Sequence, residues 1–177
     1  MSVSKPDILL VASFLSDAEA LFDNLRDSVD WDTSMTARHT ASFGEPYNYS
    51  QMAYEPRPLH PSLAPVAERL SEKLGIAFNN CLLNFYLSGD STMGFHSDDT
   101  SDLESGTGVA IVSLGSQRGI TYRSKADTQI RHTFPLATGS LLYMDSKVQD
   151  NWMHAIKKDA NAGPRISLTW RALRKAG

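Results

Sequence analysis

Residues 165–171 read Arg-Ile-Ser-Leu-Thr-Trp-Arg and alternate strictly between polar and apolar side chains. This period of two is typical of a β-strand, on which successive side chains point to opposite faces. The apolar side chains then belong to a core. Arg165 and Arg171 point the other way, into a polar cavity or, if this is an edge strand, into solvent. Two guanidinium groups suit a dicarboxylate ligand, because Arg makes planar, paired hydrogen bonds to carboxylates.

Further β-rich runs precede this segment, separated by Gly and Pro. We predict strands over 81–87, 107–115, 119–124, 128–134, 139–146 and 165–174. Many short strands without intervening helices indicate a mainly β fold, a sandwich or a jelly roll. Two N-terminal helices are predicted to flank it. The first opens with a capping box of Ser16 and Glu19, and the second runs from Ser62 to Leu74 and stops at Gly75.

Length and composition fit one globular domain, with 177 residues, 41% hydrophobic and 21% charged. We expect a single domain over 1–177, with a helical and substrate-loop region over 1–80 and a jelly-roll core over 81–177. No apolar run is long enough to span a membrane, and the N-terminus does not resemble a signal peptide. Residence in the cytoplasm is therefore expected. A monomer is also expected. The one cysteine, Cys81, excludes an intrachain disulfide and a Cys-based zinc site, and is predicted to be buried.

The charges are distributed unevenly along the chain, although the net charge is only −3. Residues 1–115 carry 6 basic and 16 acidic side chains, whereas residues 116–177 carry 11 basic and 4 acidic ones. This pattern leaves two interpretations open. Either an acidic protein has one basic face, or the two halves interleave in space and their charges cancel.

A candidate metal site lies in the segment Gly94-Phe95-His96-Ser97-Asp98. On an extended segment His96 and Asp98 point to the same side, so both can reach one metal. His154 follows 56 residues after Asp98, just past a predicted strand end. Two His and one carboxylate are the ligands of non-haem iron(II) oxygenases, and they also suit catalytic zinc. Solvated loop side chains are the alternative, and His39, His60 and His132 lack comparable partners.

The strand over 81–87 carries a second set of polar side chains. Asn84 and Tyr86 share one face, opposite an apolar face. An amide and a phenol are suited to fixing a carboxylate at the rim of a cavity. A polar outer face is the alternative.

Together these motifs resemble the AlkB family of Fe(II)- and 2-oxoglutarate-dependent dioxygenases. The resemblance covers roughly residues 36–174, and its elements are NxY (84–86), GxHxD (94–98), the distal His154 and RxSLTWR (165–171). It implies a double-stranded β-helix with Fe(II) bound by His96, Asp98 and His154. It also implies 2-oxoglutarate and O2 as cosubstrates. The residues it places around 2-oxoglutarate are Asn84, Tyr86, Arg165, Ser167 and Arg171.

The resemblance further implies oxidative demethylation of N-alkylated bases, such as 1-methyladenine and 3-methylcytosine, in DNA or RNA. Such enzymes release formaldehyde, succinate and CO2. The segment SFGEPYNYS (42–50) resembles the substrate loop of repair members, which would make Tyr49 a stacking partner of the flipped base and Tyr47 a base-edge contact. Where repair members often carry an acidic residue, Thr100 stands here, so Asp99 is the substitute candidate. No apolar wedge for duplex DNA is evident, which favours a single-stranded substrate.

The basic C-terminal half supplies the candidate phosphate contacts. They are Arg118, Arg123, Lys125, Arg131, Lys157, Lys158, Arg174 and Lys175. Two other functions stay open. One is a same-fold oxygenase acting on a free small molecule, a lipid or a protein side chain, and the other is a jelly-roll binding module without catalysis.

Overall fold

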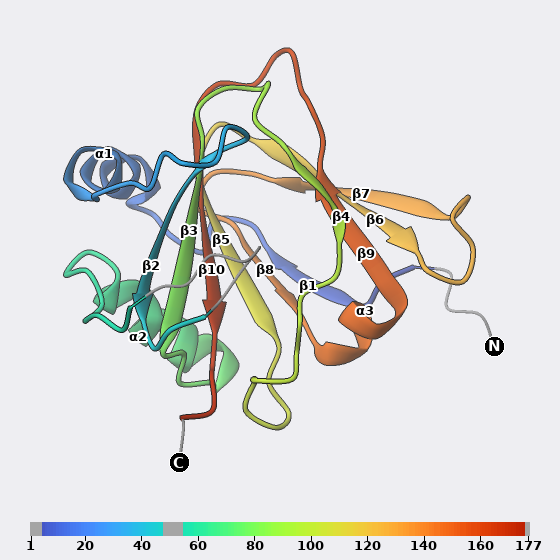
Figure 1. Cartoon of the computed structure of the whole chain (residues 1–177), viewed down its shortest axis with the longest axis horizontal. Coiled ribbons are helices and arrows are strands. Elements are labelled where there is room, and N and C mark those ends of the chain that lie inside the picture. The colour runs from blue at the N-terminus through green and yellow to red at the C-terminus, as the bar shows by residue number, and fades with distance from the viewer. Residues whose placement is uncertain (1–4, 48–54, 176–177) are drawn as a thin grey trace.

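Two antiparallel β-sheets face each other in the computed structural model, which describes residues 5–47 and 55–175 (Figure 1). The larger sheet has the strand order β1 (Ile8–Val11), β8 (Leu141–Met144), β5 (Val109–Gly115), β10 (Arg165–Arg171), β3 (Asn80–Tyr86) and β2 (His39–Gly44). The smaller sheet has the order β4 (Met93–His96), β9 (Trp152–Ile156), β6 (Arg118–Ser124) and β7 (Arg131–Leu136). The predicted mainly β jelly-roll class is confirmed.

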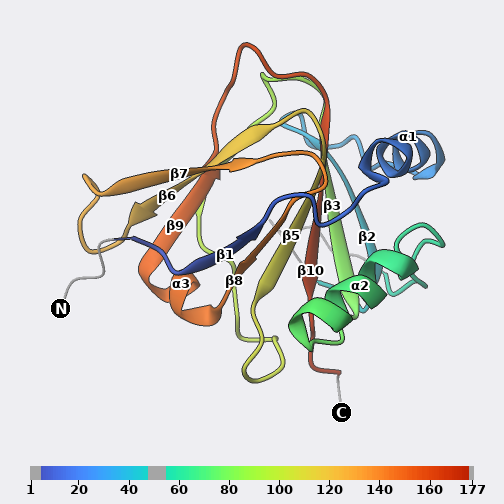
Figure 2. The ribbon, with the colours of Figure 1, turned by 180° about the vertical axis from the view of Figure 1, so that it is seen from behind.

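Helices α1 (Ala18–Ser28) and α2 (Ala64–Leu74) lie on the side of the larger sheet that faces away from the smaller sheet (Figures 1 and 2). The short α3 (Ser146–Asn151) joins β8 to β9. Helix α2 ends, as predicted, at Gly75 in the left-handed conformation. The predicted capping box is wrong: α1 is preceded by Asp17, and no side chain caps it. Within the described residues, no helix is long and apolar enough to cross a membrane.

The larger sheet is covered on both faces, which gives the molecule two apolar clusters. On the helix side, Ile166, Leu168 and Trp170 of β10 pack with side chains of α1 and α2. On the other side, Leu82 and Tyr86 of β3 pack with residues of the smaller sheet. All seven residues of β10 are buried, because this strand lies between β5 and β3. The edge-strand alternative is therefore wrong, and the two guanidinium groups of β10 face a cavity.

Several elements were not predicted from the sequence. The larger sheet takes β1 from the N-terminal region and β2 from a region, 33–60, that was expected to form extended segments and loops, and β9 carries His154, which was expected just past a strand. The run from Ile8 to Val11 is uniformly apolar, so its periodicity cannot separate a strand from a buried helix. Pairing with β8 decides its conformation. Cys81 is buried as predicted.

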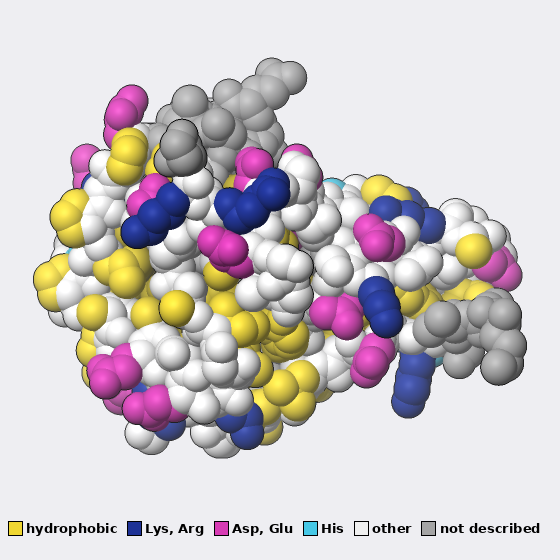
Figure 3. Space-filling model, turned by 90° about the horizontal axis from the view of Figure 1, so that it is seen from below, with side chains coloured by type: hydrophobic (Ala, Val, Ile, Leu, Met, Phe, Trp, Pro, Cys, Tyr) yellow, Lys and Arg dark blue, Asp and Glu magenta, His cyan; other side chains and the backbone are white. Residues whose placement is uncertain are grey.

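The interleaving of strands also decides how the charges are distributed. Strand β10, from the basic half, lies between β5 and β3 from the acidic half, and β4 pairs with β9. Acidic and basic side chains accordingly appear interspersed on the face that Figure 3 shows. The interleaving interpretation thus agrees with the strand order and with the face shown in Figure 3.

Candidate metal centre

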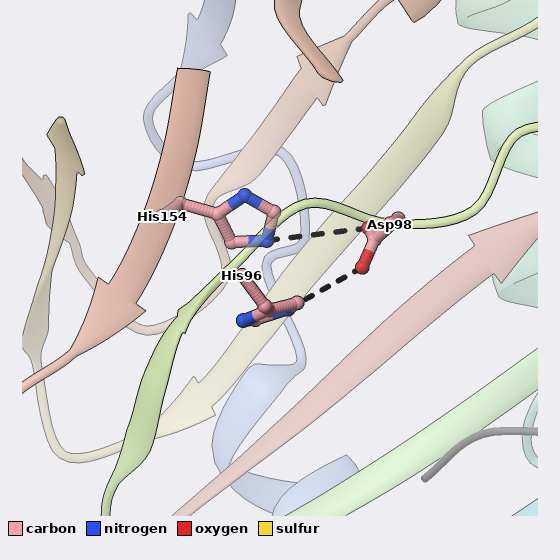
Figure 4. Close-up of side chains that lie close together, drawn as sticks. All are labelled: His96, Asp98 and His154. Atoms are coloured by element: carbon pink, nitrogen blue, oxygen red, sulfur yellow. Dashed lines mark ion pairs between the residues drawn. The ribbon is translucent and has the colours of Figure 1, made fainter. Parts of the chain in front are cut away.

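Three candidate ligands converge at the end of β4. His96 is the last residue of β4 and lies opposite His154 of β9 in the register of the two strands. Asp98 follows two residues later, and its carboxylate points back between the two rings (Figure 4). Its Oδ1 lies 3.3 Å from His96 Nε2, and its Oδ2 lies 4.0 Å from His154 Nε2. Ligand atoms of all three side chains lie within 4.8 Å of one another, a spacing that fits one metal ion.

The protonation of these groups also suits a divalent cation. His96 Nδ1 lies 2.8 Å from the Gly94 carbonyl, which can only accept, so Nδ1 is the donor of this contact and Nε2 faces Asp98. Burial lowers the pKa of His154 to about 4, so this ring is neutral at neutral pH. Burial opposes ionisation of Asp98, but the Arg171 guanidinium and the two histidines hold the pKa of its carboxyl well below the usual range. The site therefore presents two imidazoles, of which that of His154 is neutral, and one ionised carboxylate.

The cavity beside these ligands lies between the two sheets, and side chains of β3 and β10 line its wall on the larger sheet. The register places Ser167 of β10 between Asn84 of β3 and Ser113 of β5, and Arg165 opposite Tyr86. The free space within this cavity is about 40 Å³. The polar residues among those lining it are Asn84, Tyr86, His96, Asp98, His154, Arg165, Ser167, Thr169 and Arg171.

Arg165 is a buried cation in the wall of this cavity. Its side chain is 1% exposed, and Nη2 donates to Ser113 Oγ at 2.9 Å. Its guanidinium carbon lies 5.1 Å from the centroid of the Tyr86 ring. Burial lowers the pKa of Arg165, and Nε and Nη1 have no partner among the described residues. A buried cation with unpaired N–H groups is costly, so this pocket suits an anionic ligand.

Arg38 contacts the cavity-lining Asn84, and sequence reasoning missed it. It precedes β2 and is buried, and its Nε donates to Asn84 Oδ1 at 2.8 Å. Its Nη1 also donates to the Thr92 carbonyl at 3.2 Å. Because the Asn84 oxygen accepts from Arg38, the amide nitrogen of Asn84 is left to donate towards the cavity. No local pattern around Arg38 indicates this, since its partner lies 46 residues away in sequence.

Comparison with known proteins shows which family this chain belongs to. Residues 12–171 match the model of the 2OG-Fe(II) oxygenase superfamily. The DNA oxidative demethylase ALKBH2 of Mus musculus is 31% identical, over 89% of this chain and 76% of that protein. This chain belongs to the AlkB family.

A second relative and a solved structure are also similar to this chain. Alpha-ketoglutarate-dependent dioxygenase alkB homolog 3 of Bos taurus is 32% identical over 90% of this chain, which spans 63% of that relative's length. The structure of OsALKBH1 superposes with a TM-score of 0.68 at 17% identity, covering 94% of this chain and 98% of that one, and shares the fold. The expected Fe(II)- and 2-oxoglutarate-dependent oxygenase family is thereby confirmed.

The AlkB-family cofactors Fe(II), 2-oxoglutarate and O2 fit the residues present. Two imidazoles and a carboxylate form an open donor set of the type that iron(II) takes in oxygenases. Arg165 and Arg171 add two buried guanidinium groups, each with N–H groups that have no partner within the described residues. A dicarboxylate would satisfy these donors. The cavity thus combines a metal-ligand set with a binding site for an acidic cosubstrate.

The residues expected to touch the alkylated base are less closely grouped. Tyr49 lies outside the described residues. Tyr47 is buried, and the Arg171 guanidinium carbon lies 3.9 Å from its ring centroid. Asp99 is exposed, and its carboxylate accepts from the Ser101 N–H at 2.9 Å. The substrate roles of these three residues stay predictions.

The predicted phosphate contacts divide into buried and exposed side chains. Arg118 was wrongly included: it is 1% exposed, and its guanidinium donates to the carbonyls of Ser88, Ser91 and Lys157. Because its guanidinium is buried and bonded to three backbone carbonyls, Arg118 holds these loops together and cannot reach a phosphate. Lys125, Lys158, Arg174 and Lys175 are exposed.

The remaining three cations gather around one aromatic ring on the smaller sheet. The guanidinium carbon of Arg123 lies 4.0 Å from the Phe95 ring centroid. The guanidinium carbon of Arg131 and Lys157 Nζ each lie 5.5 Å from it. Within the described residues, none of the three is ion-paired to a carboxylate. We call Phe95, Arg123, Arg131 and Lys157 the Phe95 cluster.

Proposed function

We propose that this protein is an Fe(II)- and 2-oxoglutarate-dependent dioxygenase that removes alkyl groups from base nitrogens of nucleic acid, such as 1-methyladenine and 3-methylcytosine. The observation that carries the proposal is the convergence of His96, Asp98 and His154 beside the two buried guanidinium groups of Arg165 and Arg171. The name of a relative supports it as well, since the mouse protein is a DNA oxidative demethylase.

In this scheme each side chain has a separate task. His96, Asp98 and His154 hold Fe(II), which with 2-oxoglutarate and O2 supplies the oxidising chemistry that side chains lack. Arg165 and Tyr86 bind the distal carboxylate of 2-oxoglutarate, which Ser113 supports by fixing the guanidinium. Asn84, Ser167 and Arg171 complete the cosubstrate site. The methylated base, flipped from its stack, would approach the open side of the metal between Tyr47, Tyr49 and Asp99.

The Phe95 cluster supports nucleic acid as the partner. Its three cations surround one ring without an ion-paired carboxylate in the described part of the chain, so they repel each other. A polyanionic backbone would relieve that repulsion. Phe95 precedes His96 on β4, and Arg123 and Arg131 lie on β6 and β7, so the cluster belongs to the sheet that carries His96 and His154. We further propose a single-stranded substrate, and action as a monomer in the cytoplasm.

The decisive experiment is succinate release from 2-oxoglutarate by protein loaded anaerobically with Fe(II) before O2 is admitted. It is run with a single-stranded oligonucleotide that carries 1-methyladenine or 3-methylcytosine. The same oligonucleotide without the methyl group and a duplex with the lesion are the controls. We expect the methylated single strand to stimulate succinate release, with formaldehyde formed in equal amount.

Other outcomes would redirect the proposal. Succinate release that is slow and not stimulated would keep the oxygenase but shift the search to a free small molecule or a protein side chain. Stimulation by the duplex alone would contradict the single-strand preference. Binding of the oligonucleotide without any turnover of 2-oxoglutarate would favour a binding module.

A further inference from the structure

Gln149 of α3 holds Asp98 from two sides. The side chain is 3% exposed, and its Oε1 accepts from the backbone N–H of Asp98 at 2.8 Å. Its Nε2 lies 3.3 Å from Asp98 Oδ2 and 3.1 Å from the sulfur of Met144. The Gln149 amide is therefore directed at one candidate ligand and one buried sulfur.

The first of these contacts determines the second. Because a backbone N–H can only donate, the atom of Gln149 that faces it must be the amide oxygen, and the NH2 group must then face the carboxylate. Two donors face Asp98 Oδ2: Gln149 Nε2 lies 3.3 Å from it, and Arg171 Nη2 lies 3.5 Å from it. Oδ1 is the oxygen that lies 3.3 Å from His96 Nε2. One carboxylate oxygen is thus occupied by donors, and the other remains for a metal.

Gln149 also links the two halves of the candidate metal centre. It lies in α3, which leads directly into β9 and His154. Next to it, Ser97 Oγ donates to the Trp152 carbonyl at 2.7 Å, so residues 97–98 are joined to residues 149–152 by three hydrogen bonds. Lys125 Nζ in turn donates to the backbone carbonyl of Gln149 at 2.8 Å, which fixes α3 against the end of β6.

We propose that Gln149 is a positioning residue, which orients the Asp98 carboxylate so that it presents Oδ1 to the metal and keeps Oδ2 as an acceptor. Metal ligands depend on such partners, because a free carboxylate rotates and can turn either oxygen, or both, towards the ion. The inference rests on the proposed role of Asp98 as a metal ligand. It adds a residue that sequence motifs did not indicate, 51 positions from the carboxylate that it holds.

The test measures metal affinity directly and does not depend on any nucleic-acid substrate. Mn(II) binding to the metal-free protein is titrated by calorimetry for the wild type, Gln149→Met and Asn151→Ala. Methionine matches glutamine in length but lacks both hydrogen bonds. Asn151 is the matched control, since it is exposed on the same helix and its amide donates to the Lys147 carbonyl, away from Asp98. The visible absorption of the Co(II)-loaded proteins reports coordination geometry, and thermal melting of the metal-free proteins reports folding.

We expect Gln149→Met to weaken Mn(II) binding by about 10- to 100-fold and to change the Co(II) spectrum, as the loss of an outer hydrogen-bond partner does in other metal sites. Asn151→Ala should leave both unchanged. If Gln149→Met does not fold, Gln149→Asn, whose shorter amide cannot reach Asp98, takes its place with the same expectation.

Wild-type affinity and an unaltered spectrum in a folded Gln149 variant would overturn the inference and leave the metal site intact. Equal weakening in Asn151→Ala would overturn it too, because the effect would then come from the helix. Absence of metal binding by the wild type would overturn the assignment of Asp98 and this inference together. If only the oligonucleotide assay fails, the assignment of Asp98 as a metal ligand and the positioning role of Gln149 both stand.

Discussion

Arg171 and Asp98 form a buried ion pair in which Nη2 lies 3.5 Å from Oδ2, and their side chains are 2% and 4% exposed. A lone charge at this depth would be costly, and each of the two groups offsets that cost for the other. The pair explains how a carboxylate next to two imidazoles stays ionised in the metal-free protein. It also brings Arg171, which was expected at the cosubstrate, into contact with the candidate metal ligands.

Replacement of Asp98 should abolish metal binding and should also lower stability, because Arg171 loses its buried partner. We expect Asp98→Ala to lower 2-oxoglutarate turnover by more than about 100-fold, because it removes a ligand outright and not only an outer partner. Asp127→Ala is the matched control, since that carboxylate is exposed, accepts from the Gln129 N–H and lies outside the proposed site. Succinate release and circular dichroism measure the two effects. Substantial residual turnover in a folded Asp98→Ala protein would contradict the ligand assignment.

Replacement of Arg165 should act on the cosubstrate. Loss of one partner from a buried, hydrogen-bonded charge pair costs about 2 kcal/mol or more, so Arg165→Met should raise the 2-oxoglutarate KM by roughly 30-fold or more. The matched change is Arg69→Met on α2, which lies on the far side of the larger sheet and should leave the KM unchanged. A KM that is equal in both variants would mean that 2-oxoglutarate binds elsewhere.

The buried histidine should make the metal-free protein sensitive to mild acid. His154 has a pKa of about 4 when folded, against roughly 6.5 in an unfolded chain. Between these values the unfolded chain binds a proton that the folded protein does not, so the free energy of unfolding falls as pH drops from 6.5 to 4. The loss is on the order of 3 kcal/mol. Asp98, with its lowered pKa, adds a further loss only below about pH 4.

His154→Gln, which cannot titrate, should remove most of this loss. Urea unfolding of both metal-free proteins at pH 7 and pH 4.5 measures it. Parallel pH dependence in the two proteins would show that His154 is not the group responsible.

The Phe95 cluster should contribute to nucleic-acid binding through charge. Arg123→Ala and Arg131→Ala should each weaken binding of a single-stranded oligonucleotide and reduce the slope of log affinity against log salt by about 0.7 for each phosphate that is no longer neutralised. Fluorescence anisotropy at several salt concentrations gives this slope. Arg118→Met is the contrasting change: it should lower stability, because it breaks three hydrogen bonds to loop carbonyls, and leave the salt slope unchanged. An unaltered slope in the Arg123 and Arg131 variants would exclude the cluster from the interface.

The sequence by itself determined the local features of this protein. The alternation over 165–171 predicted both an apolar face and a face with two arginines, and the structure has both. The i and i+2 spacing likewise indicated that His96 and Asp98 point to one side, and Gly75 ended α2 where expected. These features succeed because each depends only on side-chain period or backbone conformation within a few residues.

Only the tertiary structure decided which distant segments meet. Strand register sets His154 opposite His96, packing makes β10 an interior strand, and α3 brings Gln149 to Asp98. Such contacts depend on how whole sheets pair and pack, and a uniformly apolar run such as β1 or a lone residue such as Gln149 carries no local period that encodes its partner. The sequence showed which residue types could bind a metal, and the long-range pairing of strands brought them together.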